Sequence, residues 1–360
     1  MSQQRQPFLL GHRRCLDGLR GVAILLVLLD HGGMCGDGFG FIGVNTFFVL
    51  SGFLITSLLV TEWEQCGFIS LRDFYFRRAL RLFPALLTML AVFVVYVLLT
   101  TSGKKTGEDL RETFWALFYF TNWAKIFELG PSLELAHTWS LSIEEQFYFV
   151  WPALLGFLLP RNNRSSLMCW ICLGVVISVS IRIYLLVASP VLSLDHLTCG
   201  LDTRADSLLL GGLVGVLITS QILVPFSHRN FFWSCLSIVS VLGLLALCHF
   251  IVVREIIYFS WLLASIFAAA VIAHLTFTVG SLAHRILENG ILVYIGQISY
   301  GLYIWHFPIL NALKQHQLPW QNMAYLIPVT PVVLLSYYFI EKPCLRWKLR
   351  FQKINQAQAT

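Results

Sequence analysis

The sequence predicts an all-α, polytopic membrane protein with about ten transmembrane helices. Of the 360 residues, 57% are hydrophobic and 12% are charged, whereas a soluble domain carries about 25% charged residues. The mean hydropathy is +0.72, and the apolar residues are gathered in segments long enough to cross a bilayer. We therefore expect one transmembrane domain over residues 1–360, with spans over about residues 16–340 and short tails.

The expected spans follow the runs of apolar residues along the chain. The first run lacks the small-residue cleavage site of a signal peptide and carries Arg20, so we interpret it as a retained span. The segments lie near residues 16–33, 40–61, 80–101, 140–160, 166–188, 205–222, 231–252, 257–279, 288–312 and 320–340.

The distribution of Lys and Arg predicts how these spans are oriented. With the N-terminus in the cytoplasm, the inside segments hold 17 of the 25 Lys and Arg residues, the outside segments hold seven, and Arg182 lies within a span. Because cytoplasmic loops carry the excess of positive charge, we expect an integral protein of the inner or plasma membrane with both termini cytoplasmic. The formal net charge of +6 is split among short loops and does not indicate nucleic-acid binding.

The first apolar segment, LDGLRGVAILLVLLDH at 16–31, holds the strongest catalytic candidate. A helix places Arg20 and His31 on one face, roughly 16 Å apart along its axis. Asp17 lies on the same stripe and can pair with Arg20. Such groups in a span normally face a protein interior or an aqueous cavity. His31 is therefore the candidate general base, although an isolated histidine at a helix end is more often simply solvated.

Arginines crowd one turn of the segment FRRALRLFP at 76–84. The side chains of Arg77, Arg78 and Arg81 suit paired hydrogen bonds to phosphate, so a phosphorylated ligand could dock here from the cytoplasm. Anchoring to anionic lipid headgroups explains the same spacing equally well.

Two adjacent acids begin an aromatic-rich helix in the segment HTWSLSIEEQFYFVWP at 137–152. Consecutive residues point in different directions, so at most one of Glu144 and Glu145 should face a common site. A simpler role is charge complementarity at the helix N-terminus, with Ser140 or Ser142 as the cap. The flanking Trp139 favours a role in the site.

Other polar residues lie within apolar segments. Asn45 could line the site, and Arg204 and Asp206 resemble a structural ion pair at a span end. Tyr303 and His306 could form a second polar wall of the site, but a buried histidine needs a partner. We favour a structural role for that histidine.

Together these motifs resemble the acyltransferase 3 family of integral membrane O-acyltransferases. The resemblance runs in order from LDGLRGVAILLVLLDH through GVNTFFVLSGFLIT, FRRALRLFP, HTWSLSIEEQFYFVWP, RADSLLLGG and SYGLYIWHFP to YYFIEKP, and covers nearly the whole chain. It implies a ten-helix domain that takes an acyl group, usually acetyl, from cytoplasmic acyl-CoA. The acceptor implied is a hydroxyl, often on an envelope polysaccharide at the outer face.

The resemblance also implies roles for individual residues. The family's Arg–His pair falls on Arg20 and His31, and its donor-contacting arginines fall on Arg78 and Arg81. Its paired acids fall on Glu144 and Glu145. Asn45 stands where relatives more often have an acid.

These residues suggest direct transfer, in which His31 activates the acceptor hydroxyl and one acid orients the imidazole or the substrate. An acyl-enzyme intermediate is the second route. The expected partners are membrane lipid, acyl-CoA as donor substrate and a carbohydrate or other hydroxyl acceptor, and we expect no metal ion. A transporter or flippase would also need a polar path through the helices, and a structural or receptor-like protein would tolerate loss of the Arg20–His31 stripe.

Overall fold

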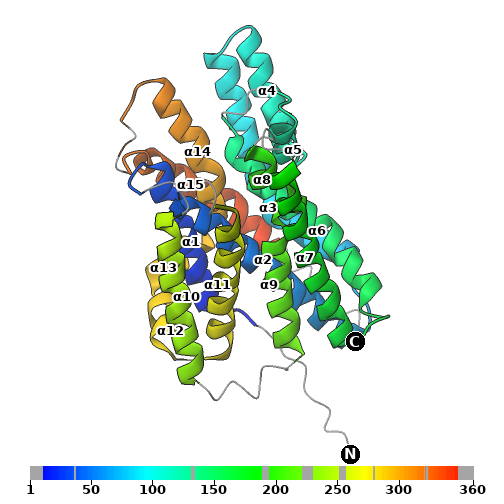
Figure 1. Cartoon of the computed structure of the whole chain (residues 1–360). Helices are drawn as coiled ribbons and strands as arrows, with labels where there is room; N and C mark the ends of the chain where they lie inside the picture. The colour runs from blue at the N-terminus through cyan, green and yellow to red at the C-terminus, as the bar shows by residue number, and fades with distance from the viewer. Residues whose placement is uncertain are drawn as a thin grey trace, which may run out of the picture. The chain divides into compact units, whose positions relative to one another are not determined.

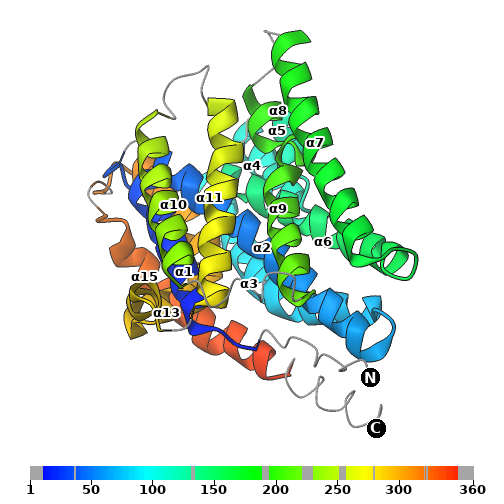
Figure 2. The ribbon, with the colours of Figure 1, turned by 60° about the horizontal axis from the view of Figure 1, so that its bottom comes forward.

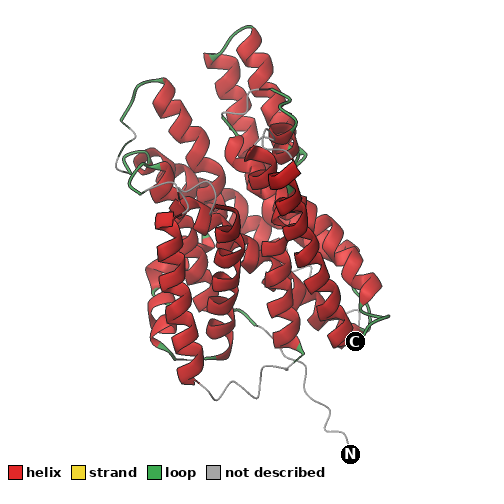
Figure 3. Cartoon of the chain, in the orientation of Figure 1, coloured by secondary structure: helices red, strands yellow, loops and turns green. Residues whose placement is uncertain are grey.

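A computed structural model shows the chain as helices joined by short loops (Figure 3). Within the described residues the elements are α-helices and short 3₁₀ or π-helical turns, with no strand, which confirms the predicted all-α class. The structure describes residues 11–35, 38–130, 134–188, 194–220, 230–250, 257–278, 280–319, 321 and 323–347.

The chain divides into two compact units, each made of two separate stretches of sequence. The first unit comprises residues 1–69 and 143–297, and the second comprises residues 70–142 and 298–360. Helix α6 (Trp139–Leu158) begins in the second unit and continues in the first.

The first unit holds most of the helices. Helix α2 packs against both α1 and α9, α7 packs against α9, and α10 lies beside α11 (Figures 1 and 2). Its helices, besides most of α6, are α1 (Arg14–His31), α2 (Gly38–Cys66), α7 (Arg164–Ala188), α8 (Leu194–Cys199), α9 (Leu201–Thr219), α10 (Asn230–Phe250), α11 (Ile257–Phe277), α12 (Leu282–Leu287) and α13 (Gly290–Gln297).

Glycines set the close approach of these helices. A Cβ atom on Gly52 of α2 would lie 1.8 Å from the carbonyl oxygen of Leu208 in α9, and one on Gly211 of α9 would lie 2.0 Å from that of Val49. Both distances are far below van der Waals contact, so only glycine allows the two backbones to lie this close. Gly52 in the segment GVNTFFVLSGFLIT therefore serves helix packing.

The second unit contains the long helix α3 and the segments around it. Helix α14 packs against α15 and contacts α3, and α3 contacts α4. The elements are α3 (Leu71–Thr100), α4 (Lys104–Leu117), α5 (Thr121–Ile126), the 3₁₀ turn η1 (Ala136–Thr138), α14 (Ser299–Gln315), α15 (Leu326–Ser336) and the π-helical turn η3 (Tyr337–Glu341).

Among the described residues, four helices are long and apolar enough to cross a membrane. They cover Gly38–Cys66, Leu71–Thr100, Arg164–Ala188 and Phe259–Phe277, and Phe231–Leu247 is a shorter apolar helix. These helices indicate a membrane protein. The expected number of about ten spans is larger, because several expected segments form shorter helices or carry charges.

The expected span at 288–312 is divided. Helix α13 ends at Gln297 and α14 begins at Ser299, and the two helices belong to different units. Gly296 explains the packing just before the break, because a Cβ there would lie 1.8 Å from the carbonyl oxygen of Asp17 in α1. The polar residues Gln297 and Ser299 interrupt the apolar run at this break and were the available signal for it.

Candidate active site

Helix α1 carries the predicted base and one of the predicted donor-binding residues. It runs without a break from Arg14 to His31, so Arg20 and His31 share one helical face, as their spacing predicts. Both side chains are half-buried. Gly33, two residues beyond His31, has a φ of +72°, a conformation that favours glycine.

Asp17 pairs with His12 in the structure, and not with Arg20 as predicted. The Asp17 Oδ2 atom lies 2.8 Å from Nε2 of His12. His12 is exposed and precedes the helix, so it lies outside the stretch in which helical spacing applies. Helical spacing alone therefore could not identify it.

The last turn of α1 lies against the start of α2. A Cβ on Gly40 would lie 2.6 Å from Oδ2 of Asp30, the residue before His31. The missing side chain at Gly40 leaves room for this carboxylate. The polar end of α1 is thus held next to the N-terminal turns of α2.

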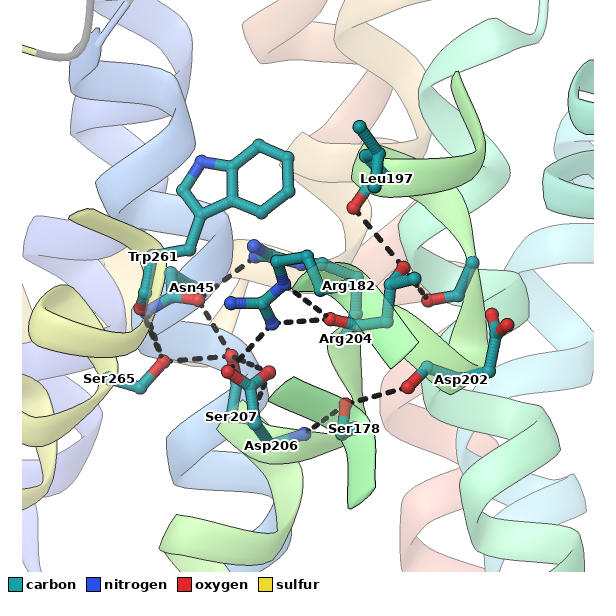
Figure 4. A network of polar contacts seen from close by, with 12 residues as sticks. Asn45, Ser178, Arg182, Leu197, Asp202, Arg204, Asp206, Ser207, Trp261 and Ser265 are labelled. Atoms are coloured by element: carbon teal, nitrogen blue, oxygen red, sulfur yellow. Dashed lines mark hydrogen bonds and ion pairs between the residues drawn. The ribbon is translucent and has the colours of Figure 1, made fainter. Parts of the chain in front are cut away.

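Asn45, fully buried on α2, lies at the centre of a polar network in the first unit (Figure 4). Its Oδ1 atom accepts hydrogen bonds from Nη2 of Arg204 and from Oγ of Ser207, each at 2.9 Å. Its Nδ2 atom donates to Oγ of Ser265 at 2.9 Å. Asn45 therefore ties α2 to α9 and α11 through side-chain hydrogen bonds.

Aromatic rings enclose the Arg204 guanidinium, which is fully buried. Its central carbon lies 4.5 Å from the ring centroid of Trp261 and 4.8 Å from that of Phe41. Both distances are within the range of cation–π attraction. The rings and the Asn45 carbonyl stabilise a cation that has no ion pair among the described residues.

The predicted ion pair between Arg204 and Asp206 is wrong. Asp206 pairs instead with Arg182 of α7, with 2.7 Å between Oδ2 and Nη2, and both side chains are almost completely buried. Residues two apart on a helix do not face each other, so Arg204 and Asp206 contact different neighbours. This role of Arg182 was not predicted, although an arginine within a span is itself a signal.

In the second unit, Tyr303 and His306 form one cluster with His137. The Tyr303 hydroxyl donates to the carbonyl oxygen of His137 at 2.7 Å, and Ser140 Oγ lies 2.6 Å from the same hydroxyl. Nδ1 of His306 lies 2.7 Å from the carbonyl oxygen of Tyr303. A carbonyl only accepts hydrogen bonds, so the neutral His306 ring is assigned the Nδ1–H form, with the lone pair on Nε2. The predicted need of His306 for a partner is met.

The two predicted phosphate-binding residues lie one turn apart on α3. Arg78 and Arg81 are both half-buried. Arg81 interacts electrostatically with Glu341, a buried carboxylate that accepts a hydrogen bond from Ser336 at 3.3 Å. Glu341 lies in the motif YYFIEKP but was not among the predicted site residues. An acid directly after an apolar span was the available signal.

Glu144 and Glu145 are half-buried in the second turn of α6. The Tyr148 hydroxyl donates to Oε2 of Glu144 at 3.2 Å. The prediction that Ser140 or Ser142 caps this helix is wrong, because α6 already begins at Trp139, directly after the turn η1. Both serines lie within the helix, and Ser142 Oγ donates to the preceding turn.

The predicted site residues are therefore divided between the two units. The first unit holds Asp17, Arg20, His31, Asn45, Glu144 and Glu145. The second unit holds Arg78, Arg81, Trp139, Tyr303 and His306, and among these the structure brings Tyr303 and His306 together. Trp139, half-buried, is the first residue of α6.

Comparison with known proteins identifies the family. Residues 13–341 match the family Acyl_transf_3, described as an acyltransferase domain. The chain belongs to this acyltransferase family. The match includes every predicted site residue, from Asp17 to His306.

Several bacterial relatives in this family have named activities. The peptidoglycan O-acetyltransferase OatA of Listeria monocytogenes is 31% identical over 350 residues, and the O-acetyltransferase OatA of Staphylococcus aureus strain NCTC 8325 is 31% identical over 356 residues. A protein of Staphylococcus aureus strain COL, whose name gives O-acetyltransferase as a provisional assignment, is 34% identical over 356 residues. Each alignment covers 91% of this chain.

The chain spans little more than half the length of these relatives, between 55% and 56%. No solved structure matches it with significant similarity.

Proposed function

We propose that this chain transfers an acetyl group from acetyl-CoA, or another acyl-CoA, to a hydroxyl group of a cell-envelope carbohydrate. The observation that carries the proposal is the match to the acyltransferase family over residues 13–341. The named relatives support acetyl as the transferred group, and one of them is named for peptidoglycan as its acceptor. A glycan hydroxyl is therefore the acceptor that we propose.

Arginines supply the donor contacts of this proposal. Arg78 and Arg81 lie one turn apart on α3 of the second unit. Guanidinium groups bind phosphate oxygens through paired, charge-assisted hydrogen bonds, so we assign the nucleotide end of acyl-CoA to these two residues. Arg20, near the start of α1 in the first unit, is a separate candidate for a contact with the donor. The excess of Lys and Arg on one side supports a cytoplasmic location for these residues and for both termini.

His31 is the proposed general base. It takes the proton of the acceptor hydroxyl while the hydroxyl oxygen attacks the carbonyl carbon of the thioester. A C–O bond forms, the C–S bond breaks, and the imidazolium returns the proton to the CoA thiolate. One of Glu144 and Glu145 orients the imidazole or the substrate. Because Arg20 and His31 are roughly 16 Å apart along α1, the thin pantetheine arm has to extend along this helix.

Acetyl-CoA labelled in its acetyl group tests the proposal. The full chain in lipid nanodiscs is incubated with the labelled donor and envelope glycan, and the glycan is then analysed for O-linked label. Label on the glycan together with stoichiometric release of free CoA supports the acyltransferase. Movement of glycan across proteoliposomes without covalent change supports a transporter or flippase and contradicts the proposal.

A further inference from the structure

A buried carboxylate in the second unit lies at the end of a π-helical turn. Glu341 is 6% exposed and is the last residue of η3, which directly follows helix α15. A buried carboxylate is costly unless it is hydrogen-bonded or paired, and single π-helical turns are frequent at functional sites. A buried acid in such a turn therefore calls for a function.

The π-helical turn directs the Glu341 carboxylate back to the end of α15. Its Oε1 atom accepts a hydrogen bond from Oγ of Ser336, five residues earlier, at 3.3 Å. In an α-helix, residues five apart lie about 140° from each other around the axis. The i to i+5 bonding of a π turn brings them together instead. The turn thus sets the direction in which Glu341 points.

Helix α14 brings this carboxylate next to the turn of α3 that carries Arg81. A Cβ atom on Gly301 would lie 3.0 Å from Oε1 of Glu341. The preceding residue, Tyr300, donates a hydrogen bond from its hydroxyl to the carbonyl oxygen of Leu82 at 3.1 Å. Glu341 and the residue after Arg81 are therefore both held by the first turn of α14.

The charged group that faces Glu341 comes from α3. Arg81 acts electrostatically on the carboxylate, whereas α15 carries no charged residue and the first turn of α14 adds only the phenol of Tyr300. Burial raises the pKa of the Glu341 carboxyl to about 7, although the hydrogen bond from Ser336 and the charge of Arg81 both lower it. The attraction between Glu341 and Arg81 therefore changes near neutral pH.

The two arginines assigned to the donor are held in different ways. The central guanidinium carbon of Arg78 lies 5.9 Å from the ring centroid of Phe74, one turn earlier on α3, within the range of cation–π attraction. Arg81 has the Glu341 carboxylate as its neighbour. A guanidinium has five N–H donors, so it can serve a carboxylate and phosphate oxygens at the same time.

We propose that Glu341 is a positioning residue, whose carboxylate holds the Arg81 guanidinium in the orientation that binds the phosphate oxygens of acyl-CoA. A free arginine side chain has many rotamers and loses this freedom on binding. An arginine that is already oriented loses less, so it binds the phosphate more tightly. The inference rests on the proposed assignment of the nucleotide end of acyl-CoA to Arg78 and Arg81.

Binding of CoA to the full chain in nanodiscs, measured without acceptor, tests this role apart from catalysis. Glu341→Gln keeps the oxygen that accepts from Ser336 but removes the charge. Above pH 7 it should weaken CoA binding about two- to tenfold, because Arg81 is then ordered only on binding. The matched control is Asp73→Asn, which removes an acid from the first turn of α3 and should not weaken CoA binding.

A positioning role also predicts coupling to Arg81, which a merely structural role does not. In an Arg81→Gln background, Glu341→Gln should have no further effect on CoA affinity. The ratio of the CoA dissociation constants of Glu341→Gln and the wild type should be largest above pH 7. It should fall towards one below pH 7, because Glu341 of the wild type becomes protonated at about 7.

Unchanged or tighter CoA binding by Glu341→Gln above pH 7 overturns the inference, and so does an equal loss of affinity with and without Arg81. If Glu341→Gln does not fold, the wild type and Arg81→Gln decide: affinity lost near pH 7 in the wild type should be absent in Arg81→Gln, and identical pH dependence overturns the inference. A wild type that binds CoA in this way but forms no acetylated glycan removes the proposed transfer and leaves the role of Glu341 standing.

Discussion

Replacement of Asp206 by Asn should destabilise the first unit severely. Asp206 is fully buried, and Arg182, its partner at 2.7 Å, is 2% exposed. The same network holds Arg204, whose side-chain hydrogen bond goes to Asn45. Asp206 is the acid that forms an ion pair with Arg182, so the substitution removes a buried counter-charge from this arginine.

The size of the effect follows from this arrangement. Removing one partner of a buried ion pair costs about 3–5 kcal/mol, because the other charge stays buried and uncompensated. At about 1.4 kcal/mol per factor of ten, the ratio of folded to unfolded protein should fall by roughly two to four orders of magnitude. Replacing both partners, as Asp206→Asn with Arg182→Met, should recover much of this loss because no unpaired arginine is left at position 182.

Unfolding of the purified protein in mixed micelles, as a function of the mole fraction of sodium dodecyl sulfate, measures these differences. Asp202→Asn is the control, since Asp202 lies on the same helix but pairs with His196 at a partly exposed position; it should cost at most about 1 kcal/mol. Unfolding of Asp206→Asn at the same detergent fraction as the wild type would contradict this prediction, and so would a double variant that is less stable than the single one.

Three further changes test other parts of the structure. Gly52→Ala should cost about 1–3 kcal/mol or more by overpacking, since its Cβ would meet a backbone oxygen at 1.8 Å, whereas Gly156→Ala has open space. Thermal unfolding should therefore show a lower melting temperature for Gly52→Ala than for Gly156→Ala, and equal melting temperatures would contradict this. Asn45→Leu should lower the free energy of unfolding by about 1–3 kcal/mol, because it leaves the polar partners of Asn45 unsatisfied. Asn45→Asp should be tolerated better, because its charge compensates Arg204. Equal losses of stability for the two variants in detergent unfolding would contradict this. Burial raises the pKa of Asp109 above its ordinary value of 3.8, so the folded state binds the proton more tightly than the unfolded state. Protection of α4 in hydrogen exchange should therefore be greatest at pH values below the ordinary pKa and should fall as the pH rises through the raised pKa. Asp109→Asn should make this protection nearly independent of pH. The same pH dependence in the variant and the wild type would contradict the prediction.

The sequence predicted the features that depend on local periodicity. The stripe of Arg20 and His31 holds because α1 is one unbroken helix. Composition was sufficient for the all-α class, since in a bilayer backbone groups have to be satisfied within helices or closed barrels.

Partners that are distant in sequence were not predictable in this way. Asp206 pairs with Arg182, 24 positions away, and Arg204 bonds to Asn45, 159 positions away. The order of residues shows which side chains need a partner, but the packing of the helices decides which partner is close.

Activity of the His31→Ala variant tests the proposed mechanism most directly. The full chain in nanodiscs is supplied with acetyl-CoA and glycan fragments, and acetylated glycan is counted per mole of folded protein. The control is His196→Ala, which removes a histidine held by Asp202 in the same unit. Loss of a general base lowers turnover by about 10²–10⁴-fold, so we expect that loss for His31→Ala and near-normal turnover for His196→Ala. Wild-type turnover by a folded His31→Ala protein would contradict it.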